Sequence, residues 1–448
     1  MKAPSLLAEI AGLTDAKRLP VSSLLDTNFV LEALQEQVGP DHAKLSRVET
    51  EHVRYVPGTS LVASYRVHFT NADHTQEQLT RVYCKASRAE AFPRALERAK
   101  GLTWAESQLF SSPVSCPGIN VLLFEFPNDA RLLNLRSIQP RSLGMMLSRF
   151  AGGESAAQQD LQVELLRYKP ESRCVARVRF ESTPEAPPSV AVLRWERPDK
   201  VGVAYQLLAQ LGHLLEGDPH LGVAPPLFAV ETQGISAVRW VDGEPLSHRL
   251  TGSDREADLC RAGVALQKLH RQSIREVPRL AATDFLIRAR PSVDHLAQHG
   301  PSAALATALF AVLVQVESRF PAAPFGFTHG DFHQGQVICG AEKLWFLDLD
   351  RACLSEVDRD TGGLLAHLHL LDLKHQLQDR ARCERAFLAG YRESAGYVPD
   401  AGRLNFWTAL GLLELAAKQF RRLKPGWPER ISAILARGLE LVQDGAAA

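Results

Sequence analysis

The chain has 448 residues, of which 45% are hydrophobic and 23% are charged, and its 51 basic residues are balanced by 51 acidic ones. This is the composition of an ordinary folded protein, and its length predicts two or three structural units because single cores stop growing near roughly 250–300 residues. The zero net charge provides no overall attraction to nucleic acid or to an anionic membrane, so neither is expected as a partner.

The N-terminal residues and the cysteines indicate where the protein resides. Residues 1–20 lack the apolar core of a signal peptide, and no apolar run elsewhere reaches transmembrane length. The seven cysteines are scattered and never spaced as CxxC. They are therefore expected to be reduced thiols, without a disulfide framework or a zinc knuckle. Together these features predict a cytoplasmic protein.

The N-terminal half contains two segments that resemble each other. Residues 53–67 read VRYVPGTSLVASYRV and residues 166–180 read LRYKPESRCVARVRF. Each segment is followed, in the same order, by a second strand, a helix-like stretch and an apolar strand. This shared order predicts a degenerate internal repeat. The alternative is two unrelated strand–helix units that share only a preference for strands.

The C-terminal half changes to a helical pattern from about residue 255 onward. Apolar residues recur at helical spacing in 259–270, 302–319, 362–375, 383–392, 404–421 and 430–443, and a short strand pair interrupts them near 325–350. The predicted fold class is therefore α+β. We expect an N-terminal cap over 1–150 that is a degenerate copy of an αβ lobe, an αβ lobe over 161–250, and a helical lobe over 251–448. Residues 150–160 read as a linker and 181–190 as a hairpin loop.

The stretch FTHGDFHQGQVICGAEKLWFLDLD at 327–350 concentrates polar residues between apolar strands. If Cys339 pairs with Leu344, antiparallel counting places Asp348 next to Gln336. A carboxylate and a side-chain amide offer oxygen ligands, which suit Mg²⁺. Asp331, just upstream, remains available for another role.

This arrangement resembles the catalytic loop of kinases, in which an Asp is followed five positions later by a metal-binding amide. HGDFHQGQ is similar to the HGDxHxxN or HGDxHxGQ loop of aminoglycoside phosphotransferases, maltokinases and related bacterial sugar kinases. FLDLDRA resembles the second metal motif of that superfamily, and AGVALQKLH at 262–270 resembles its helix ending in Leu-His. The resemblance covers about residues 160–440.

The resemblance implies a protein-kinase-like fold of two lobes and transfer of the γ-phosphate of ATP to a hydroxyl group of a small molecule. ATP and Mg²⁺ are the implied cofactors. Asp331 would be the catalytic base or hydroxyl-orienting group, and Gln336 and Asp348 would bind the metal. The glutamine form of the loop favours a sugar or amino sugar as the acceptor.

The nucleotide-binding residues are also implied by the resemblance. No GxGxxG precedes a strand, so the turn at 170–173, which includes Arg173, would hold the phosphates. Arg194 takes the place of the basic residue expected on the third strand and would clamp phosphate oxygens. No acidic residue at 200–215 is an obvious partner for it. Trp240 and Val241, in a hinge near 240–244, would meet the nucleotide base.

Two further residues are expected to support the loop. His329 is expected to brace it by a hydrogen bond to the backbone. Asp360 is expected to be the N-cap of a helix over 361–371, because Asp precedes a helical run there.

Two alternatives from other classes remain open at this point. A pseudokinase, which binds or scaffolds without turnover, is favoured by Gln336 and the missing glycine loop, whereas the presence of Asp331 and Asp348 argues against it. A metal-dependent hydrolase is suggested by His329, Asp331 and His333, which are residue types that bind zinc. The second histidine cluster that such an enzyme needs is lacking in the sequence.

The two repeats carry a basic residue on corresponding strands, Lys85 in the first and Arg194 in the second. We expect only the second repeat to serve catalysis, because it runs directly into the helical lobe. The first repeat is expected to be a cap, a wall of the acceptor pocket or a stabilising lobe.

Overall fold

The computed structural model describes residues 6–11, 13, 19–38, 42–71, 76–110, 113–151, 161–180, 189–300, 302–395 and 397–447. The predicted linker at 150–160 and the predicted hairpin loop at 181–190 lie outside these ranges except at their ends. The chain divides into two units. Unit 1 comprises Met1–Tyr205, Leu227–Trp240 and Arg421–Gly426, and unit 2 comprises Gln206–Pro226, Val241–Phe420 and Trp427–Ala448.

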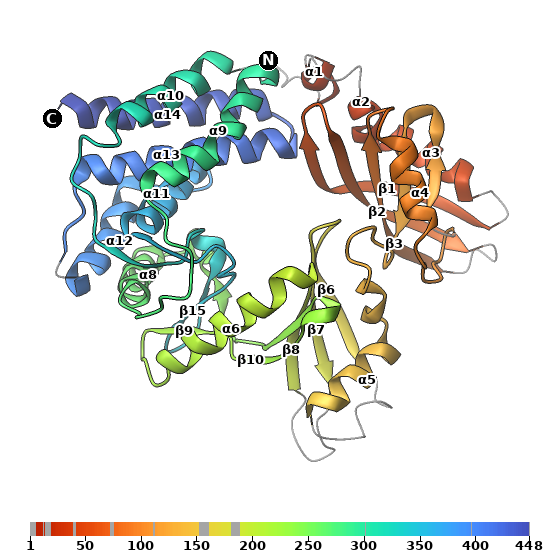
Figure 1. The fold of residues 1–448 in the computed structure, drawn as a ribbon, viewed down its shortest axis with the longest axis horizontal. Coiled ribbons are helices and arrows are strands. Elements are labelled where there is room, and N and C mark those ends of the chain that lie inside the picture. The colour runs from red at the N-terminus through yellow and green to blue at the C-terminus, as the bar shows by residue number, and fades with distance from the viewer. Residues whose placement is uncertain are drawn as a thin grey trace. The chain divides into compact units, whose positions relative to one another are not determined.

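Unit 1 contains two five-stranded sheets whose strands follow the same order. Figure 1 labels β1 to β3 in the first sheet and β6 to β8 in the second. The first sheet runs β1-β2-β3-β5-β4. The second, taken from its β6 edge, runs β6-β7-β8-β11-β10 and so corresponds to the first strand for strand. In each, a helix follows the third strand: α4 (Phe92–Lys100) in the first and α6 (Pro198–Leu214) in the second. The two similar sequence segments thus form the first hairpins of two sheets with one topology.

The remaining elements of these sheets have the following bounds. The first sheet contains β1 (Ala43–Val56), β2 (Ser60–Asn71), β3 (Glu77–Ser87), β4 (Val114–Cys116) and β5 (Val121–Glu125). The second contains β6 (Gln162–Lys169), β7 (Arg173–Phe180), β8 (Ser189–Trp195), β10 (Pro226–Val230) and β11 (Ile235–Arg239). Further helices of this unit are α1 (Leu6–Ala11), α2 (Val21–Leu25), α3 (Thr27–Val38) and α5 (Pro140–Ala151).

The two sheets of unit 1 share one hydrophobic core. A single cluster of buried side chains includes Tyr83 and Phe124 from the first repeat together with Tyr168 and Trp195 from the second. The rings of Tyr83 and Phe124 stack at 4.8 Å, and Tyr83 meets Tyr168 edge to face at 6.4 Å. Aromatic contacts of this kind add to the free energy gained by burying apolar area. The repeats are therefore parts of one structural unit.

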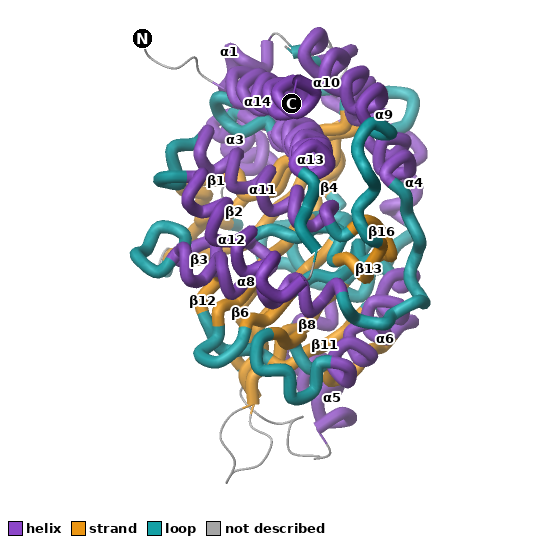
Figure 2. Tube along the Cα trace, turned by 90° about the vertical axis from the view of Figure 1, so that its left-hand side faces the viewer, coloured by secondary structure: helices purple, strands orange, loops and turns teal. Residues whose placement is uncertain are grey.

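Unit 2 is mainly helical (Figure 2). Its helices are α7 (Leu246–Arg249), α8 (Arg255–His270), α9 (Ala282–His299), α10 (Ala303–Val316), α11 (Asp358–Leu373), α12 (Arg380–Ala395), α13 (Ala401–Arg422) and α14 (Trp427–Ala447). The predicted α+β class and the predicted helical segments are confirmed. Helix α9 was not predicted, because Pro291 lies inside it and interrupts a helical reading of the sequence.

Two small sheets complete unit 2. One has the order β12-β14-β15-β9, and the other pairs β13 with β16. Their bounds are β9 (Leu221–Val223), β12 (Glu244–Pro245), β13 (Phe325–Thr328), β14 (Val337–Cys339), β15 (Leu344–Phe346) and β16 (Cys353–Glu356). The loop with the HGD motif therefore lies between strands of two different sheets. Among the described residues, no helix combines the length and apolarity needed to cross a membrane.

Candidate active site

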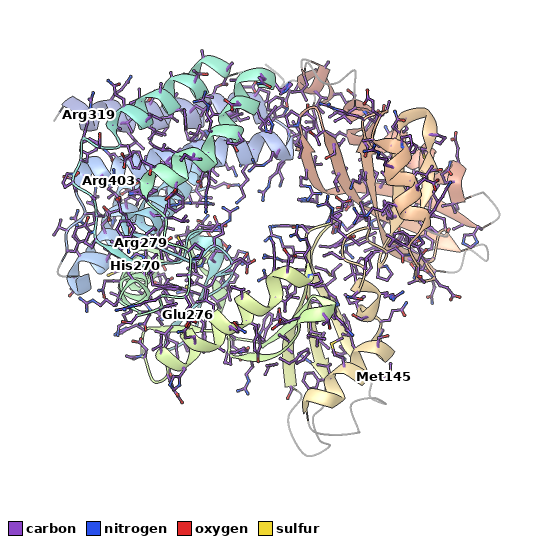
Figure 3. All side chains as sticks on the ribbon, viewed as in Figure 1. Met145, His270, Glu276, Arg279, Arg319 and Arg403 are labelled. Carbon is purple, nitrogen blue, oxygen red and sulfur yellow. The ribbon has the colours of Figure 1, made fainter. Side chains whose placement is uncertain are left out.

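Asp360 on α11 holds the loop that carries the HGD motif. Its carboxylate accepts the backbone N–H of His329 at 2.6 Å and that of Gly330 at 2.8 Å. His270, labelled in Figure 3, places Nε2 at 3.2 Å from the same carboxylate. An ionised carboxylate only accepts hydrogen bonds, so His270 donates here and its Nδ1 faces the Tyr391 hydroxyl at 2.8 Å.

These contacts correct the predicted role of Asp360. Helix α11 begins at Asp358, so Asp360 lies inside the helix and is not its N-cap. Its function is structural, but its partners lie about thirty residues upstream, in the loop. Burial by itself raises the pKa of Asp360, but the hydrogen bond and charge of His270 and the N–H of His329 outweigh that effect, so the pKa lies below its usual value. The anchor is therefore ionised.

Gly330 is required by the shape of the loop. Its φ is +77°, in the left-handed region that favours glycine, and an added Cβ would lie 2.1 Å from the carbonyl oxygen of Arg351. The loop backbone consequently passes close to the segment that follows the DLD motif. No larger residue fits between them.

His329 braces the loop from its other side. Its Nε2 donates to the carbonyl oxygen of Leu347 at 2.8 Å, and the ring is completely buried. Phe332 and Phe346 contact the imidazole edge to face. The predicted hydrogen bond of His329 to the backbone is confirmed.

The predicted hairpin register is also confirmed. Cys339 pairs with Leu344 and Val337 with Phe346, and one more backbone bond joins Leu347 to Gln336 at 2.9 Å. Asp348 then leaves the strand with a φ of +59°. The antiparallel pairing therefore extends to Leu347, opposite Gln336, and ends just before Asp348.

The charged residues of the loop gather around His333. Burial is the main reason that the pKa of His333 falls to about 4, and the charges of Asp331, Lys418, His329 and Asp348 also act on it. The His333 ring stacks on His367 at 4.2 Å, and its Nδ1 accepts the N–H of Gly335. His333 is thus a neutral, fixed side chain within electrostatic reach of both candidate acidic groups.

The Asp331 carboxylate is partly exposed. Its side chain is 33% exposed, and its nearest cation is Arg351, whose Nη1 lies 4.0 Å from Oδ1. Asp348 and Gln336 are half-buried. A carboxylate and an amide oxygen are the ligand types of Mg²⁺, so this pair fits that metal. Among the described residues, no three His, Cys, Asp or Glu side chains are grouped closely enough to hold a metal, as a zinc hydrolase would require.

The predicted phosphate-binding arginines lie in unit 1. Arg194 on β8 forms an ion pair with Glu196 at 2.8 Å, and Arg173 lies 3.8 Å from the same carboxylate. The acidic partner of Arg194 is therefore Glu196, which directly follows β8, and not a residue of α6. The signal in the sequence was its spacing, since extended residues two apart point to the same face. Glu196 brings together two residues predicted to bind phosphate.

The predicted phosphate-binding turn is tied to the first repeat. Glu171 occupies it with a φ of +61°, where the matching turn of the first sheet has Gly58 at +64°. Its buried carboxylate pairs with Lys85 at 2.6 Å and with Arg54 at 3.0 Å. These ion pairs hold Glu171 in a conformation that non-glycine residues rarely adopt.

The predicted hinge coincides with a boundary between the units, since Trp240 ends a segment of unit 1 and Val241 begins a segment of unit 2. The Arg177 guanidinium lies over the Trp240 ring at 4.5 Å, and the backbone N–H of Trp240 donates to the backbone carbonyl oxygen of Val190. Trp240 is therefore held by the second sheet.

Comparison with known proteins gives one match to a family and several to solved structures. The phosphotransferase enzyme family matches residues 159–407. A choline/ethanolamine kinase family protein from Mesorhizobium loti is 16% identical, with a TM-score of 0.47, and the match covers 68% of this chain and 97% of that one. For a macrolide 2′-phosphotransferase from Brachybacterium faecium the identity is 18%, the TM-score 0.42, and the coverage 66% and 97%. A search of curated proteins found no match.

The family match covers more than half of the chain and includes the HGD loop and the DLD motif. The chain belongs to the phosphotransferase enzyme family. The resemblance that HGDFHQGQ and FLDLDRA indicated is thereby confirmed. The similarities to solved structures are too low in identity and TM-score to add to this assignment.

Proposed function

We propose that the protein transfers the γ-phosphate of ATP to a hydroxyl group of a small molecule, with a sugar or amino sugar as the acceptor. The observation that carries this proposal is the state of the HGD loop. Asp360 and His329 fix its backbone from two sides, whereas the Asp331 carboxylate stays partly exposed. A rigid loop that presents one carboxylate is the arrangement that hydroxyl activation requires.

Asp331 would orient the acceptor hydroxyl and accept its proton. The hydroxyl oxygen would form a bond to the γ-phosphorus as the bond from that phosphorus to the β–γ bridging oxygen breaks, releasing ADP. Gln336 and Asp348 would hold Mg²⁺, which neutralises phosphate charge when bound. Arg194 and Arg173 would contact the phosphates, and Trp240 with Val241 the nucleotide base.

The proposed class of acceptor rests on the loop. Its glutamine form resembles that of sugar kinases, and the stacked rings of His333 and His367 supply flat side chains next to the HGD motif. Two proteins of similar structure are named as kinases of choline or of macrolides. These compounds therefore have to be tested as well.

The test is a phosphorylation screen of sugars, aminoglycosides, macrolides and amino alcohols with ATP and Mg²⁺, read by mass spectrometry. A product heavier by one phosphoryl group from a sugar or amino sugar is the expected result. Product from amino alcohols alone would overturn the acceptor class. Binding of ATP without turnover of any compound would favour the pseudokinase alternative.

A further inference from the structure

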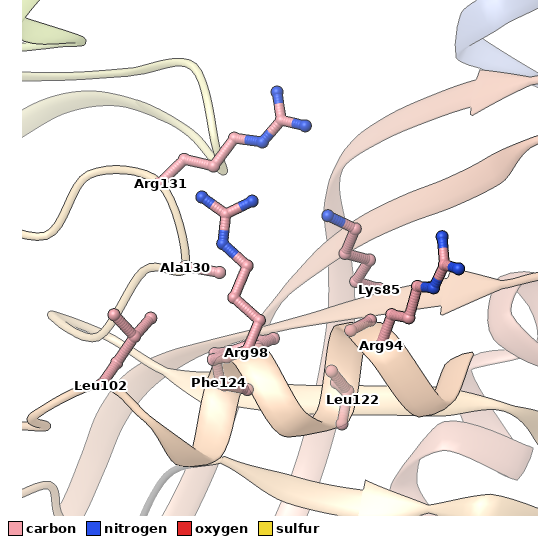
Figure 4. A pocket seen from close by; sticks show the side chains of 10 residues that line it. Lys85, Arg94, Arg98, Leu102, Leu122, Phe124, Ala130 and Arg131 are labelled. Carbon is pink, nitrogen blue, oxygen red and sulfur yellow. The ribbon is translucent and has the colours of Figure 1, made fainter. Parts of the chain in front are cut away.

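The first repeat contains a pocket to which the proposed reaction assigns no role. It has a volume of about 200 Å³. Four of its lining side chains are cationic: Lys85 on β3, Arg94 and Arg98 on α4, and Arg131 after β5. Figure 4 shows their charged ends on the same side, away from Leu122 and Phe124 beneath them. The pocket therefore has a cationic rim over an apolar floor.

The charges at this rim are not balanced by the protein. Glu171 is the carboxylate beside it, at 2.6 Å from Lys85 and 3.9 Å from Arg131, and it also pairs with Arg54. Within the described chain, the side chains of Arg94 and Arg98 form no hydrogen bond or ion pair. Several like charges around one small cavity create a positive potential that an anion would relieve.

The wall that carries Arg131 is fixed in advance. The backbone N–H groups of Arg131 and Leu132 donate to the Asp129 carboxylate at 2.8 Å and 2.9 Å. The N–H of Ala130 donates to the Tyr83 hydroxyl at 2.8 Å. Because this loop is already ordered, a ligand would not have to pay the free energy of ordering it.

The floor is equally well defined. Leu122 and Phe124 come from β5 and are almost fully buried, and Phe124 stacks on Tyr83 and contacts Trp104 at 5.5 Å. Leu102, which also lines the pocket and is half-buried, leaves apolar area that an organic group could cover and an inorganic ion could not. The chemistry of floor and rim together matches a small molecule with a phosphate group and an organic part.

The position of the pocket supports a phosphate ligand. Lys85 lies on the third strand of the first sheet, as Arg194 does on the third strand of the second, and α4 follows that strand as α6 follows its counterpart. The first repeat thus retains a basic strand residue beside a helix, and α4 adds two arginines to it. Arginine is well suited to phosphate because its planar group donates two parallel hydrogen bonds.

We propose that this pocket binds a small organic phosphate, such as a nucleoside diphosphate or a sugar phosphate, as a ligand additional to the two substrates of the transfer reaction. The proposal depends only on the geometry of unit 1. It can be tested independently of the catalytic activity proposed for the HGD loop.

The test is isothermal titration of the full chain with pyrophosphate, ADP and glucose 6-phosphate, in the presence of EDTA so that no divalent metal assists binding elsewhere. Arg98→Ala is compared with Lys100→Ala. Lys100 lies on the same helix, is paired with Glu97 and does not line the pocket, so the control removes the same charge. Both positions are exposed, and circular dichroism would verify that both variants fold.

We expect Arg98→Ala to weaken binding about tenfold or more, since a charge-assisted hydrogen bond to the phosphate is lost. Lys100→Ala should bind like the wild type. Tighter binding of ADP or glucose 6-phosphate than of pyrophosphate would show that the apolar floor contacts the ligand. Whichever of these two compounds has the higher affinity identifies the organic group. Equal affinities of the two variants, or no binding of any probe to the wild type, would overturn the proposal.

Discussion

Asp360 accepts the backbone N–H of His329 across about thirty residues of sequence, at 2.6 Å, and so joins helix α11 to the HGD loop. The pair fixes the backbone directly before Asp331 without using any catalytic atom. The loop thus has a buried anchor, Asp360, and a partly exposed carboxylate, Asp331, which is the proposed reactive group.

Replacing the anchor should disturb the loop more than the helix. In Asp360→Asn, one of the two N–H groups that the carboxylate accepts would face an amide donor, and an unsatisfied buried donor costs about 1–3 kcal/mol. We expect a lower free energy of unfolding by that amount and a fall in kcat with a smaller change in KM for ATP. Asp372→Asn on the same helix is the control, and equal effects of both substitutions would contradict the anchoring role.

Asp331→Asn tests the candidate base. The variant should fold and bind ATP normally, and its turnover should fall by roughly 10²–10⁴-fold, the usual contribution of a general base. Steady-state kinetics and nucleotide titration measure the two quantities, with the exposed Asp254→Asn as a charge-matched control. Near-wild-type turnover in Asp331→Asn would eliminate the assignment.

Asp348 and Gln336 should differ in their tolerance to substitution. Asp348→Ala removes a charged oxygen ligand and should abolish Mg²⁺-dependent ATP binding. Gln336→Asn keeps the amide oxygen, so the variant should retain part of the activity. Titrations of ATP with and without Mg²⁺ provide the measurement. If Mg²⁺ dependence were unchanged in Asp348→Ala, the metal would have to bind elsewhere.

Asp358 should make stability fall as the pH rises. Burial raises its pKa to about 7, while the Tyr397 hydrogen bond opposes that rise. In the unfolded chain the carboxyl group ionises at about pH 4. Between about pH 4 and pH 7 the folded state therefore binds more protons than the unfolded state. The folded state loses stability as the pH rises through this range. Asp358→Asn should remove this loss and be more stable than the wild type above about pH 7.

Denaturant unfolding over that pH range measures the difference between the two proteins. It should be close to zero at the acidic end and grow toward the alkaline end to a few kcal/mol. Parallel stability curves for the wild type and Asp358→Asn would show that the carboxyl group is not responsible.

Lys85 and Arg194 should have separable roles. Arg194→Ala should weaken ATP binding and lower turnover, because the second repeat is the proposed nucleotide site. Lys85→Ala should leave the KM for ATP and the turnover nearly unchanged but lower stability, because buried Glu171 loses its 2.6 Å partner. Steady-state kinetics and thermal unfolding of both variants test this. A raised KM for ATP in Lys85→Ala alone would assign the catalytic nucleotide site to the first repeat.

The predictable parts of the site are those set by neighbours in sequence. The hairpin from Val337 to Phe346 was predictable because alternating apolar residues and a short turn determine its register. The anchor at Asp360 was not, because its partners become neighbours only when α11 packs against the loop. Glu171 is a similar case, since its ion pair with Lys85 depends on packing between the repeats. A local sequence pattern does not predict contacts that form only in the tertiary structure.

The shared core of unit 1 also constrains the order in which the chain can fold during its synthesis. Tyr83 and Phe124 leave the ribosome well before Trp195 and Ile235, which belong to the same buried cluster. Until the second sheet has emerged, the first exposes an apolar face, and such surfaces favour aggregation in nascent chains. The N-terminal repeat therefore completes its core only together with its counterpart. A ribosome pause before residue 240 would prolong the exposure of the apolar face, whereas a bound chaperone would cover it.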